Sequence, residues 1–561
     1  MSAAGCSTGA VGGDASPAGD LGVLADSGGG AMDSGVPASD SGEPASDSGV
    51  PGADSGVPAS DSGIPASDSG VPASDSGVPA ADSGVPASDS GVAPTDSGVA
   101  STIPGPSERA IGRGGSYFGF AERFNRYYTD PSWTPSSTLY VSPTGGGTGE
   151  TMGSPTTVAD GFSRVQAGMR IYFLPGTYGG CFELDSSKSG TYDQPIVLYA
   201  DHTPGTPYDV QINCCNTGRQ TCFNFEQADY VAVDGFELIG GRYGVRGVGL
   251  LSGSSASHQK GLAVLNSYGH DQNNDPFFTG QSDWVVLDGL LATGGGAGDG
   301  HGIYLSNGSD YLIARNIELH SNSSSDFQIN ADPASTCTDE NIPVDDPRCD
   351  GPAAMGQGEG VSEYVTLEYN YFHHGDEQGP NFTSVRNSIV RNNVIGFYAR
   401  HGFSFWQETD NPRLGSSDNQ ILHNLFISTN NRHALQFIAN SDRNLVANNL
   451  LLGITTGGAA NPSALLLEVD ATVTANTWVG NTWVSGMLDG RTPSAQEVRL
   501  NTFDPAWFNG FGGAVGSPVT DYRPRSASPL AGSVPRRAEL PIDFTGAARG
   551  DPTTPGPFEA R

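Results

Sequence analysis

The sequence is poor in positive charge. Only two of its 561 residues are lysines, Lys188 and Lys260, and residues 1–107 contain neither lysine nor arginine but 14 acidic residues. The net charge is −34 for the chain and −20 for residues 108–561. This balance argues against nucleic acid or an anionic membrane as a partner. The sequence also lacks any run of 18 apolar residues, so it predicts no transmembrane helix.

A short motif recurs between residues 231 and 476. An apolar residue is followed three positions later by Asn or Asp, at spacings of 22 to 54 residues, and the longest spacing contains one insertion. Asn and Asp tolerate the left-handed backbone of a tight corner, and stacked Asn corners can hydrogen-bond to one another. The nine markers are Asp234, Asn266, Asp288, Asn316, Asn370, Asn393, Asn424, Asn449 and Asn476.

Coils of this length are typical of a parallel β-helix. Residues 300–330 show the unit, in which short apolar strands alternate with polar turns. Each coil has too little apolar surface to fold alone, and stacking supplies the core. The blades of a β-propeller, the main structural alternative, need about 40–45 residues. The pattern therefore predicts an all-β, single-stranded parallel β-helix.

Three segments resemble the opening of right-handed parallel β-helix proteins of the pectate-lyase-like superfamily. They are Thr138–Pro143 (TLYVSP), Gly153–Pro155 (GSP) and Arg170–Tyr178 (RIYFLPGTY). Asp521–Arg523 (DYR) through Ser528–Gly532 (SPLAG) is similar to the way in which many of them end. The resemblance covers roughly residues 136–535 and implies a right-handed solenoid. Lyases of this family commonly use a Lys or Arg base, with calcium bridging to a uronate carboxylate.

The composition divides the chain into four parts. Residues 1–107 are a low-complexity linker in which Asp-Ser-Gly-Val-Pro-Ala-Ser repeats every seven residues, and we expect it to be disordered, either as a surface spacer or as a solvating tail. Residues 108–135 are rich in aromatic side chains, which favours packing on the solenoid over a sugar-stacking site. The β-helix domain spans 136–535, with a helix over 156–167 capping its first coil. A C-terminal tail, 536–561, follows.

Seven cysteines suggest an oxidising compartment. Ala3-Ala4-Gly5-Cys6 looks like a bacterial lipoprotein cleavage box, although no hydrophobic segment precedes it. Lipidation of Cys6 would leave six cysteines for disulfides, and the alternative is a free terminal cysteine. We expect a Cys337–Cys349 disulfide, whereas the pairing of Cys181, Cys214, Cys215 and Cys222 stays open.

A long acidic insertion, residues 332–360, interrupts the coils. Its candidate calcium ligands are Asp332, Asp345, Asp346 and Asp350, because hard cations prefer several oxygen ligands. No ordered ligand spacing accompanies them, so a solvated acidic loop is the alternative. No other metal or cofactor is predicted.

One outward stripe carries the candidate site. Alternation along a strand places Ile303, Leu305, Phe327, Ile329, Phe403, Phe405, Leu435 and Phe437 inward. The outward residues, expected to bind substrate, are Tyr304, Asp326, Gln328, Trp406, Glu408 and Gln436. Histidine precedes the strand in three coils, and arginine precedes two of these histidines. The candidate catalytic residues are therefore His301, His401, His433, Arg400 and Arg432, with capping of strand ends as the structural alternative.

Histidine can move a proton near neutral pH, and arginine can neutralise a carboxylate beside the carbon that loses its proton. We therefore expect a secreted or cell-surface monomer, anchored to a bacterial outer membrane if Cys6 is lipidated, that acts on an acidic polysaccharide by β-elimination. The alternatives are a glycoside hydrolase that uses Asp326 and Glu408 and a non-catalytic polysaccharide-binding protein. The sequence does not identify the polysaccharide.

Overall fold

The computed structural model describes residues 120–561 except 207, 215–220, 251–257, 297–299, 334–335, 338–348, 350–359 and 410. Within these ranges the α-helices are short, α1 (Arg126–Thr129) and α2 (Val158–Ser163), and almost all other regular structure is β-strand. No helix of the described residues is long and apolar enough to cross a membrane.

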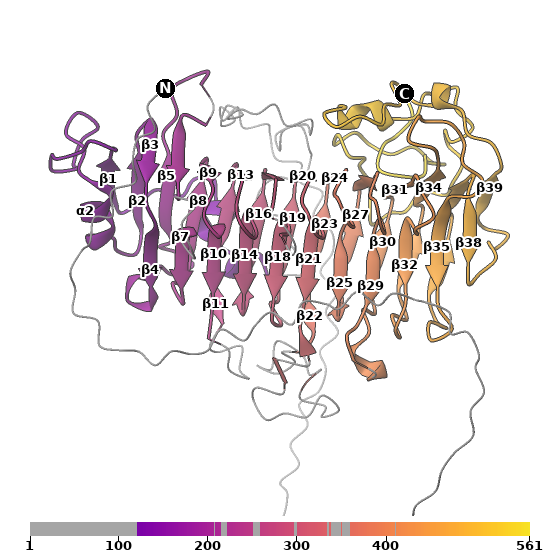
Figure 1. Cartoon of the computed structure of the whole chain (residues 1–561), viewed down its shortest axis with the longest axis horizontal. Helices are drawn as coiled ribbons and strands as arrows, with labels where there is room; N and C mark the ends of the chain where they lie inside the picture. The colour runs from indigo at the N-terminus through magenta and orange to yellow at the C-terminus, as the bar shows by residue number, and fades with distance from the viewer. Residues whose placement is uncertain are drawn as a thin grey trace, which may run out of the picture. The chain divides into compact units, whose positions relative to one another are not determined.

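Three long parallel sheets, A, B and C, form the walls of a β-helix (Figure 1). Sheet A has the order β1 (Ser137–Val141), β2 (Met169–Phe173), β5 (Ile196–Ala200), β8 (Val231–Asp234), β12 (Ala263–Leu265), β16 (Val285–Asp288), β19 (Leu312–Arg315), β23 (Thr366–Glu368), β27 (Ile389–Arg391), β30 (Gln420–Leu422), β33 (Leu445–Ala447), β36 (Thr477–Val479). Sheet B has the order β3 (Gly176–Gly179), β6 (Val210–Asn213), β9 (Glu237–Ile239), β13 (Tyr268–His270), β17 (Leu291–Thr293), β20 (Glu318–His320), β24 (Tyr371–His373), β28 (Val394–Gly396), β31 (Leu425–Ser428), β34 (Leu450–Gly453), β37 (Thr482–Val484), β39 (Val498–Leu500).

Sheet C has the order β4 (Phe182–Asp185), β7 (Thr221–Glu226), β10 (Tyr243–Val248), β14 (Phe277–Gly280), β18 (Ile303–Ser306), β21 (Phe327–Asn330), β25 (Asn381–Thr383), β29 (Ser404–Trp406), β32 (Leu435–Phe437), β35 (Leu465–Val469), β38 (Met487–Asp489). Two small parallel pairs, β11 (Gln259–Lys260) with β15 (Ser282–Asp283) and β22 (Ser362–Glu363) with β26 (Val385–Arg386), complete the strands. The predicted all-β, right-handed parallel β-helix is confirmed.

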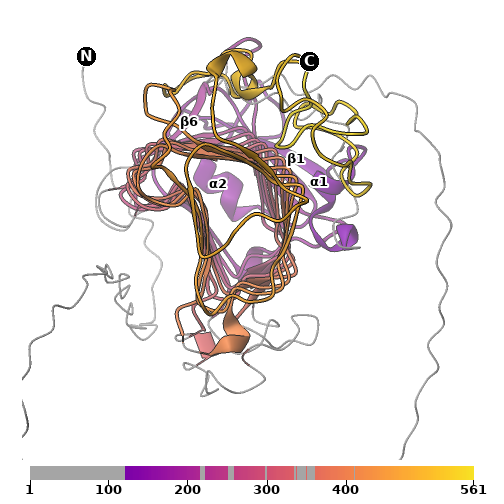
Figure 2. The same ribbon diagram turned by 90° about the vertical axis from the view of Figure 1, so that its right-hand side faces the viewer.

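The core lies inside the coils, which superimpose in the end-on view of Figure 2. The eight residues of sheet C that were predicted to point inward are all at most 2% exposed. Their side chains meet inward residues of sheets A and B in one continuous hydrophobic cluster. The period-2 alternation therefore assigns the two faces of sheet C correctly.

A ladder of buried asparagines stabilises the corner after sheet A. Each asparagine of the ladder donates its side-chain Nδ2–H to the side-chain oxygen, Oδ1, of the asparagine on the following coil, at 2.9–3.1 Å. The donors are Asn370, Asn393, Asn424 and Asn449, and the last acceptor is Asn481. Each of these carbonyl oxygens also accepts a backbone N–H from the preceding coil. The predicted stacking of Asn corners is therefore confirmed.

The nine sequence markers do not share one register. Asp234 and Asp288 end sheet A strands, and Asn266 and Asn316 occupy the next position, where the backbone is left-handed. Asn370, Asn393, Asn424 and Asn449 lie one position further along. Asn476 lies at the opposite end of the sheet, where it accepts the backbone N–H of Asn444. The marker rule therefore finds the coils, but the marked position drifts by one or two residues among the first eight markers and misses the corner at Asn476, because the rule uses a sequence interval and not a hydrogen bond.

Two predicted packing segments are present. Helix α2 contacts β1 and lies within the outline of the coils at the N-terminal end (Figure 2). The described part of the aromatic segment packs on the outer face of sheet A, with Phe124 and Tyr128 buried among sheet A side chains. Tyr128 donates a hydrogen bond to Asp288 at 3.2 Å. Packing, and not sugar stacking, accounts for these aromatic residues.

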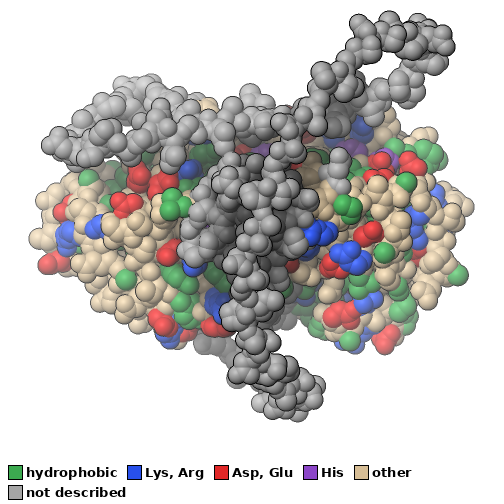
Figure 3. Space-filling model, turned by 90° about the horizontal axis from the view of Figure 1, so that it is seen from below, with side chains coloured by type: hydrophobic (Ala, Val, Ile, Leu, Met, Phe, Trp, Pro, Cys, Tyr) green, Lys and Arg blue, Asp and Glu red, His purple; other side chains and the backbone are tan. Residues whose placement is uncertain are grey.

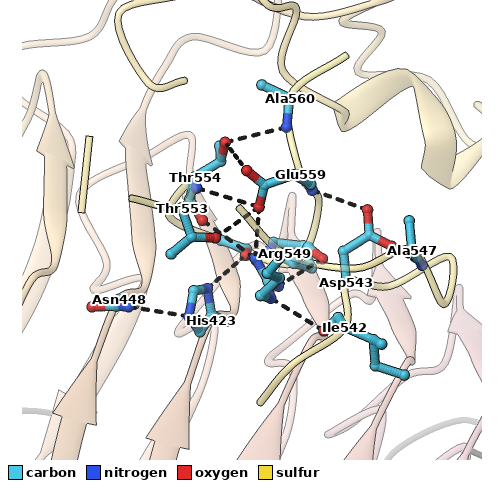
Figure 4. Close-up of polar contacts among 12 residues, drawn as sticks. His423, Asn448, Ile542, Asp543, Ala547, Arg549, Thr553, Thr554, Glu559 and Ala560 are labelled. Carbon is cyan, nitrogen blue, oxygen red and sulfur yellow. Dashed lines mark hydrogen bonds and ion pairs between the residues drawn. The ribbon is translucent and has the colours of Figure 1, made fainter. Parts of the chain in front are cut away.

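Residues 536–561, set apart by sequence as a tail, pack against the last coils (Figure 1). Arg549 is buried and donates hydrogen bonds to Asn392 Oδ1 and to the backbone carbonyls of Gly556 and Pro557. It also donates to the backbone carbonyls of Ile542 at 3.1 Å and Thr554 at 3.3 Å (Figure 4). Burial lowers the pKa of Arg549 to about 10. The end of the chain therefore covers part of sheets A and B.

The described cysteines answer the open pairing question in part. Cys337 and Cys349 form the predicted disulfide. Cys214 pairs with Cys222, and Cys181 is free and exposed. Cys6, Cys215 and residues 1–119 lie outside the described residues.

Candidate functional site

The outward face of sheet C carries a continuous row of side chains, one from each of eight successive strands, β10 to β35. Strand register aligns Arg246, Phe278, Tyr304, Gln328, Asn381, Ser404, Gln436 and Glu468. Neighbouring strands are about 4.8 Å apart, so the row follows the solenoid axis as an extended polymer would. Asn381 was not found by sequence, because β25 contributes a single inward apolar residue, Phe382, after the long insertion.

The later part of the row is hydrogen-bonded from coil to coil. Asn381 Nδ2 donates to Gln328 Oε1 at 2.8 Å, and Ser404 Oγ donates to Gln436 Oε1 at 2.9 Å. Gln436 Nε2 in turn donates to Glu468 Oε2. The four residues from Gln328 to Gln436 are only 4–8% exposed. They form an ordered floor whose side-chain orientations are set before any ligand arrives.

His401, His433 and Glu468 meet at one end of this floor. The imidazoles of His401 and His433 stack with their centroids 5.7 Å apart and their planes 15° apart. Glu468 Oε2 lies 2.9 Å from His433 Nδ1. Adjacent coils place the two histidines in equivalent positions, since the N–H of Gly402 donates to the carbonyl of His433. The sequence predicted the two histidines but not Glu468, which is visible only as the next outward residue after Gln436.

The electrostatics of the three groups differ. Burial, followed by the charge of His433, lowers the pKa of His401 to about 4, so its imidazole is neutral at pH 7. The hydrogen bond from His433 lowers the pKa of Glu468, so its carboxylate is ionised. His401 Nδ1 is buried and has no hydrogen-bond partner. The neutral imidazole of His401 therefore lies beside the imidazole of His433, which contacts the carboxylate of Glu468.

An exposed arginine directly precedes each histidine of the pair. Arg400 and Arg432 are both exposed, and their charges contribute to lowering the pKa of His401. Arg400 forms an ion pair with Glu377 at 3.3 Å. That pair is half-exposed and therefore weak, so Arg400 can exchange Glu377 for a carboxylate of a ligand.

His301 belongs to the same row of strand-preceding residues but not to the cluster. Its Nδ1 lies 3.0 Å from the carbonyl of Ser325, whose hydroxyl accepts a hydrogen bond from Gln378. Gln378 occupies the equivalent position on the coil before His401. The row therefore runs from His301 through Ser325 and Gln378 to His401, and three strand spacings, about 14 Å, separate the two histidines. The sequence indicated one intervening coil because β25 was missed.

The prediction that Asp326 faces outward is wrong. Asp326 is fully buried and accepts hydrogen bonds from Tyr398 at 2.5 Å and from Asn322 at 2.7 Å. Burial raises its pKa to about 7. Asp326 precedes β21, where the chain is still turning, so strand alternation does not apply to it. Because Glu408 is exposed and accepts a hydrogen bond from Asn330 at 2.7 Å, the two carboxylates predicted for a hydrolase occupy different environments.

The remaining predicted residues lie on the expected face. Tyr304 and Trp406 are partly exposed, and Tyr304 packs 4.9 Å from His301. In the view of Figure 3, the visible basic and acidic side chains are interspersed. Of the suggested calcium ligands, only Asp332 is among the described residues, whereas Asp345, Asp346 and Asp350 are not.

Comparison with known proteins gives partial similarities. No family model matches the chain. A pectate lyase, PEL9 of Emericella nidulans, is 30% identical over 142 residues, which are 23% of this chain and 33% of that protein. The chain therefore spans about a third of the length of the curated relative that it matches.

Two solved structures are similar in fold. Pectate lyase Pel9A is 14% identical, with coverage of 77% of this chain and 98% of that one and a TM-score of 0.44. An alginate lyase from Paenibacillus sp. is 12% identical, with coverage of 65% and 99% and a TM-score of 0.37. At the level of the fold, the resemblance to right-handed parallel β-helix proteins of the pectate-lyase-like superfamily is confirmed.

Proposed function

We propose that the protein is a carbohydrate-active β-helix protein that binds an extended acidic polysaccharide along sheet C and cleaves it by β-elimination. The observation that carries the proposal is the pair of stacked imidazoles, one neutral, each preceded in sequence by an exposed arginine, at the end of an ordered polar floor. A polymer of sugars matches a row of side chains that stand at equivalent positions on successive coils.

The chemistry follows from the positions of these groups. Arg400 and Arg432 neutralise the carboxylate of one sugar, which acidifies the neighbouring C–H bond. His401 accepts that proton, the C–H electron pair forms the new C=C bond, and the bond to the next sugar's oxygen breaks. His433, oriented by Glu468, supplies the proton that this oxygen takes up. The step needs no oxidant or co-reactant.

The test is a substrate panel of polygalacturonate, alginate and a neutral glucan. Ultraviolet absorbance from the unsaturated product marks elimination. Reducing ends without that absorbance mark a hydrolase, and retention of polymer without either marks a binding protein. An enzyme that cleaves only the neutral glucan would refute the proposal.

Variants locate the site. His401→Ala removes the proton acceptor, so we expect turnover to fall by about 10²–10⁴-fold. Arg432→Ala should mainly raise KM for the acidic polymer. The matched controls are His270→Ala, a partly buried histidine of sheet B, and Arg443→Ala, an exposed arginine paired with Asp418. Unchanged turnover in His401→Ala would place the chemistry elsewhere.

We further propose that the protein works outside the cytoplasm as a monomer, with lipidation at Cys6 as its anchor. The two disulfides support an oxidising compartment. Mass spectrometry of the N-terminus from native cells tests the anchor, and an unmodified Cys6 would rule it out. Sedimentation of the purified chain tests the oligomeric state.

A further inference from the structure

We propose that His401, His433 and Glu468 form a site for a transition-metal ion of the zinc class, and that metal bound there inhibits the enzyme. One nitrogen of each imidazole and one carboxylate oxygen lie within 4.8 Å of one another. Two imidazoles and one carboxylate are a ligand set that suits Zn²⁺ and leaves a fourth position for water.

The local packing favours this use of the three groups. His401 Nδ1 is buried and has no hydrogen-bond partner, which is costly unless a ligand occupies it. Glu468 Oε2 already lies 2.9 Å from His433 Nδ1, close to the separation of two ligands on one ion. Bonds of about 2.0–2.1 Å in a tetrahedron place ligand atoms about 3.3 Å apart, so no pair of ligand atoms needs to close by more than about 1.5 Å.

The surroundings hold the ligands in place. Gln436 donates a hydrogen bond to Glu468, and it accepts one from Ser404 at 2.9 Å. This outer shell fixes the carboxylate, as outer partners do at known metal sites. The ligand chemistry also selects the metal, because two imidazole nitrogens suit zinc, nickel or copper, whereas calcium prefers oxygen ligands throughout.

The inhibitory consequence rests on the proposed function. An ion bonded to both imidazoles occupies the nitrogens that the proton transfer uses, so metal binding and turnover exclude each other. In the absence of the ion, the same three groups are free for acid–base chemistry.

Calorimetric titration of the metal-free full chain with Zn²⁺ tests the site without any assay of activity. We expect one ion per chain and affinity reduced at least about 100-fold in both His401→Ala and Glu468→Gln. His270→Ala is the control, since His270 also lies beside a carboxylate, Glu237, at 3.1 Å. Circular dichroism of each variant verifies folding.

The outcomes separate the two proposals. Absence of zinc binding, a zinc affinity in both ligand variants equal to that of the unsubstituted chain, or binding of Ca²⁺ as strong as that of Zn²⁺ overturns the metal site, even if elimination activity is found. Zinc binding at the expected residues, without elimination on any polymer, upholds the metal site and refutes only the proposed function. If zinc binds and elimination continues at saturating zinc, the inhibitory role is refuted.

Discussion

Replacing Asn424 with alanine should test the asparagine ladder most directly. Asn424 Oδ1 accepts from the backbone N–H and the side-chain amide of Asn393, at 3.0 and 2.9 Å. Its own amide donates to the Val390 carbonyl at 2.9 Å and to Asn449 Oδ1 at 3.1 Å. The residue is fully buried, so water does not replace these partners.

The magnitude follows from these four hydrogen bonds. Each contributes about 1 kcal/mol net, which predicts a loss of about 4 kcal/mol in the free energy of unfolding. Asn431→Ala is the matched control, because Asn431 is exposed in the turn between β31 and β32, and the loss in this variant should stay within about 0.5 kcal/mol.

Urea unfolding, followed by fluorescence, measures the difference between the two variants. Because a solenoid can unfold in parts, amide exchange at Asn393 should be recorded as well, since its N–H loses its acceptor in Asn424→Ala. A loss below about 1 kcal/mol with unchanged exchange at Asn393 would refute the view that the ladder stabilises the stack.

Three further predictions concern buried charge. The pKa of Asp326 is raised to about 7, above its unfolded value of about 3.9. The folded state therefore holds more protons between these values, and stability should fall by roughly 4 kcal/mol at most as pH rises through that window. In Asp326→Asn, urea midpoints across pH should lose this slope, and an identical slope would contradict the assignment. Burial keeps the pKa of His423 well below its usual value. Stability should therefore fall as pH drops below about 6.5, because only the unfolded state takes up the proton. The loss of stability at acid pH should be smaller in His423→Gln, and equal acid sensitivity of the two proteins would contradict this role of His423. Arg549→Ala should release the C-terminal segment to limited proteolysis, whereas the exposed Arg536→Ala should not, and equal resistance would show that the segment is held by other contacts.

Short-range patterns were sufficient to predict the fold. Coil length, strand alternation and Asn corners depend on the chain's own periodicity, so they are visible without coordinates. The same alternation placed Tyr304, Gln328, Trp406 and Gln436 on the outward face correctly. The rule failed at Asp326, because that residue lies in a turn before the strand.

The site could be predicted only in part, because it depends on which coils are neighbours. His401 and His433 were found because their local sequences match. Glu468 has no such match and joins them only through the pairing of β32 with β35. A missed three-residue strand, β25, was enough to misplace His301 by one coil.

The sequence by itself determined that short coils stack into a parallel β-helix, because each coil repeats the same inward apolar and corner polar residues. Only the tertiary structure decided the register of that stack, the burial of Asp326 and the meeting of two imidazoles with one carboxylate. Such contacts join residues more than 30 positions apart, and backbone hydrogen bonds between coils, not local propensity, set which of them face each other.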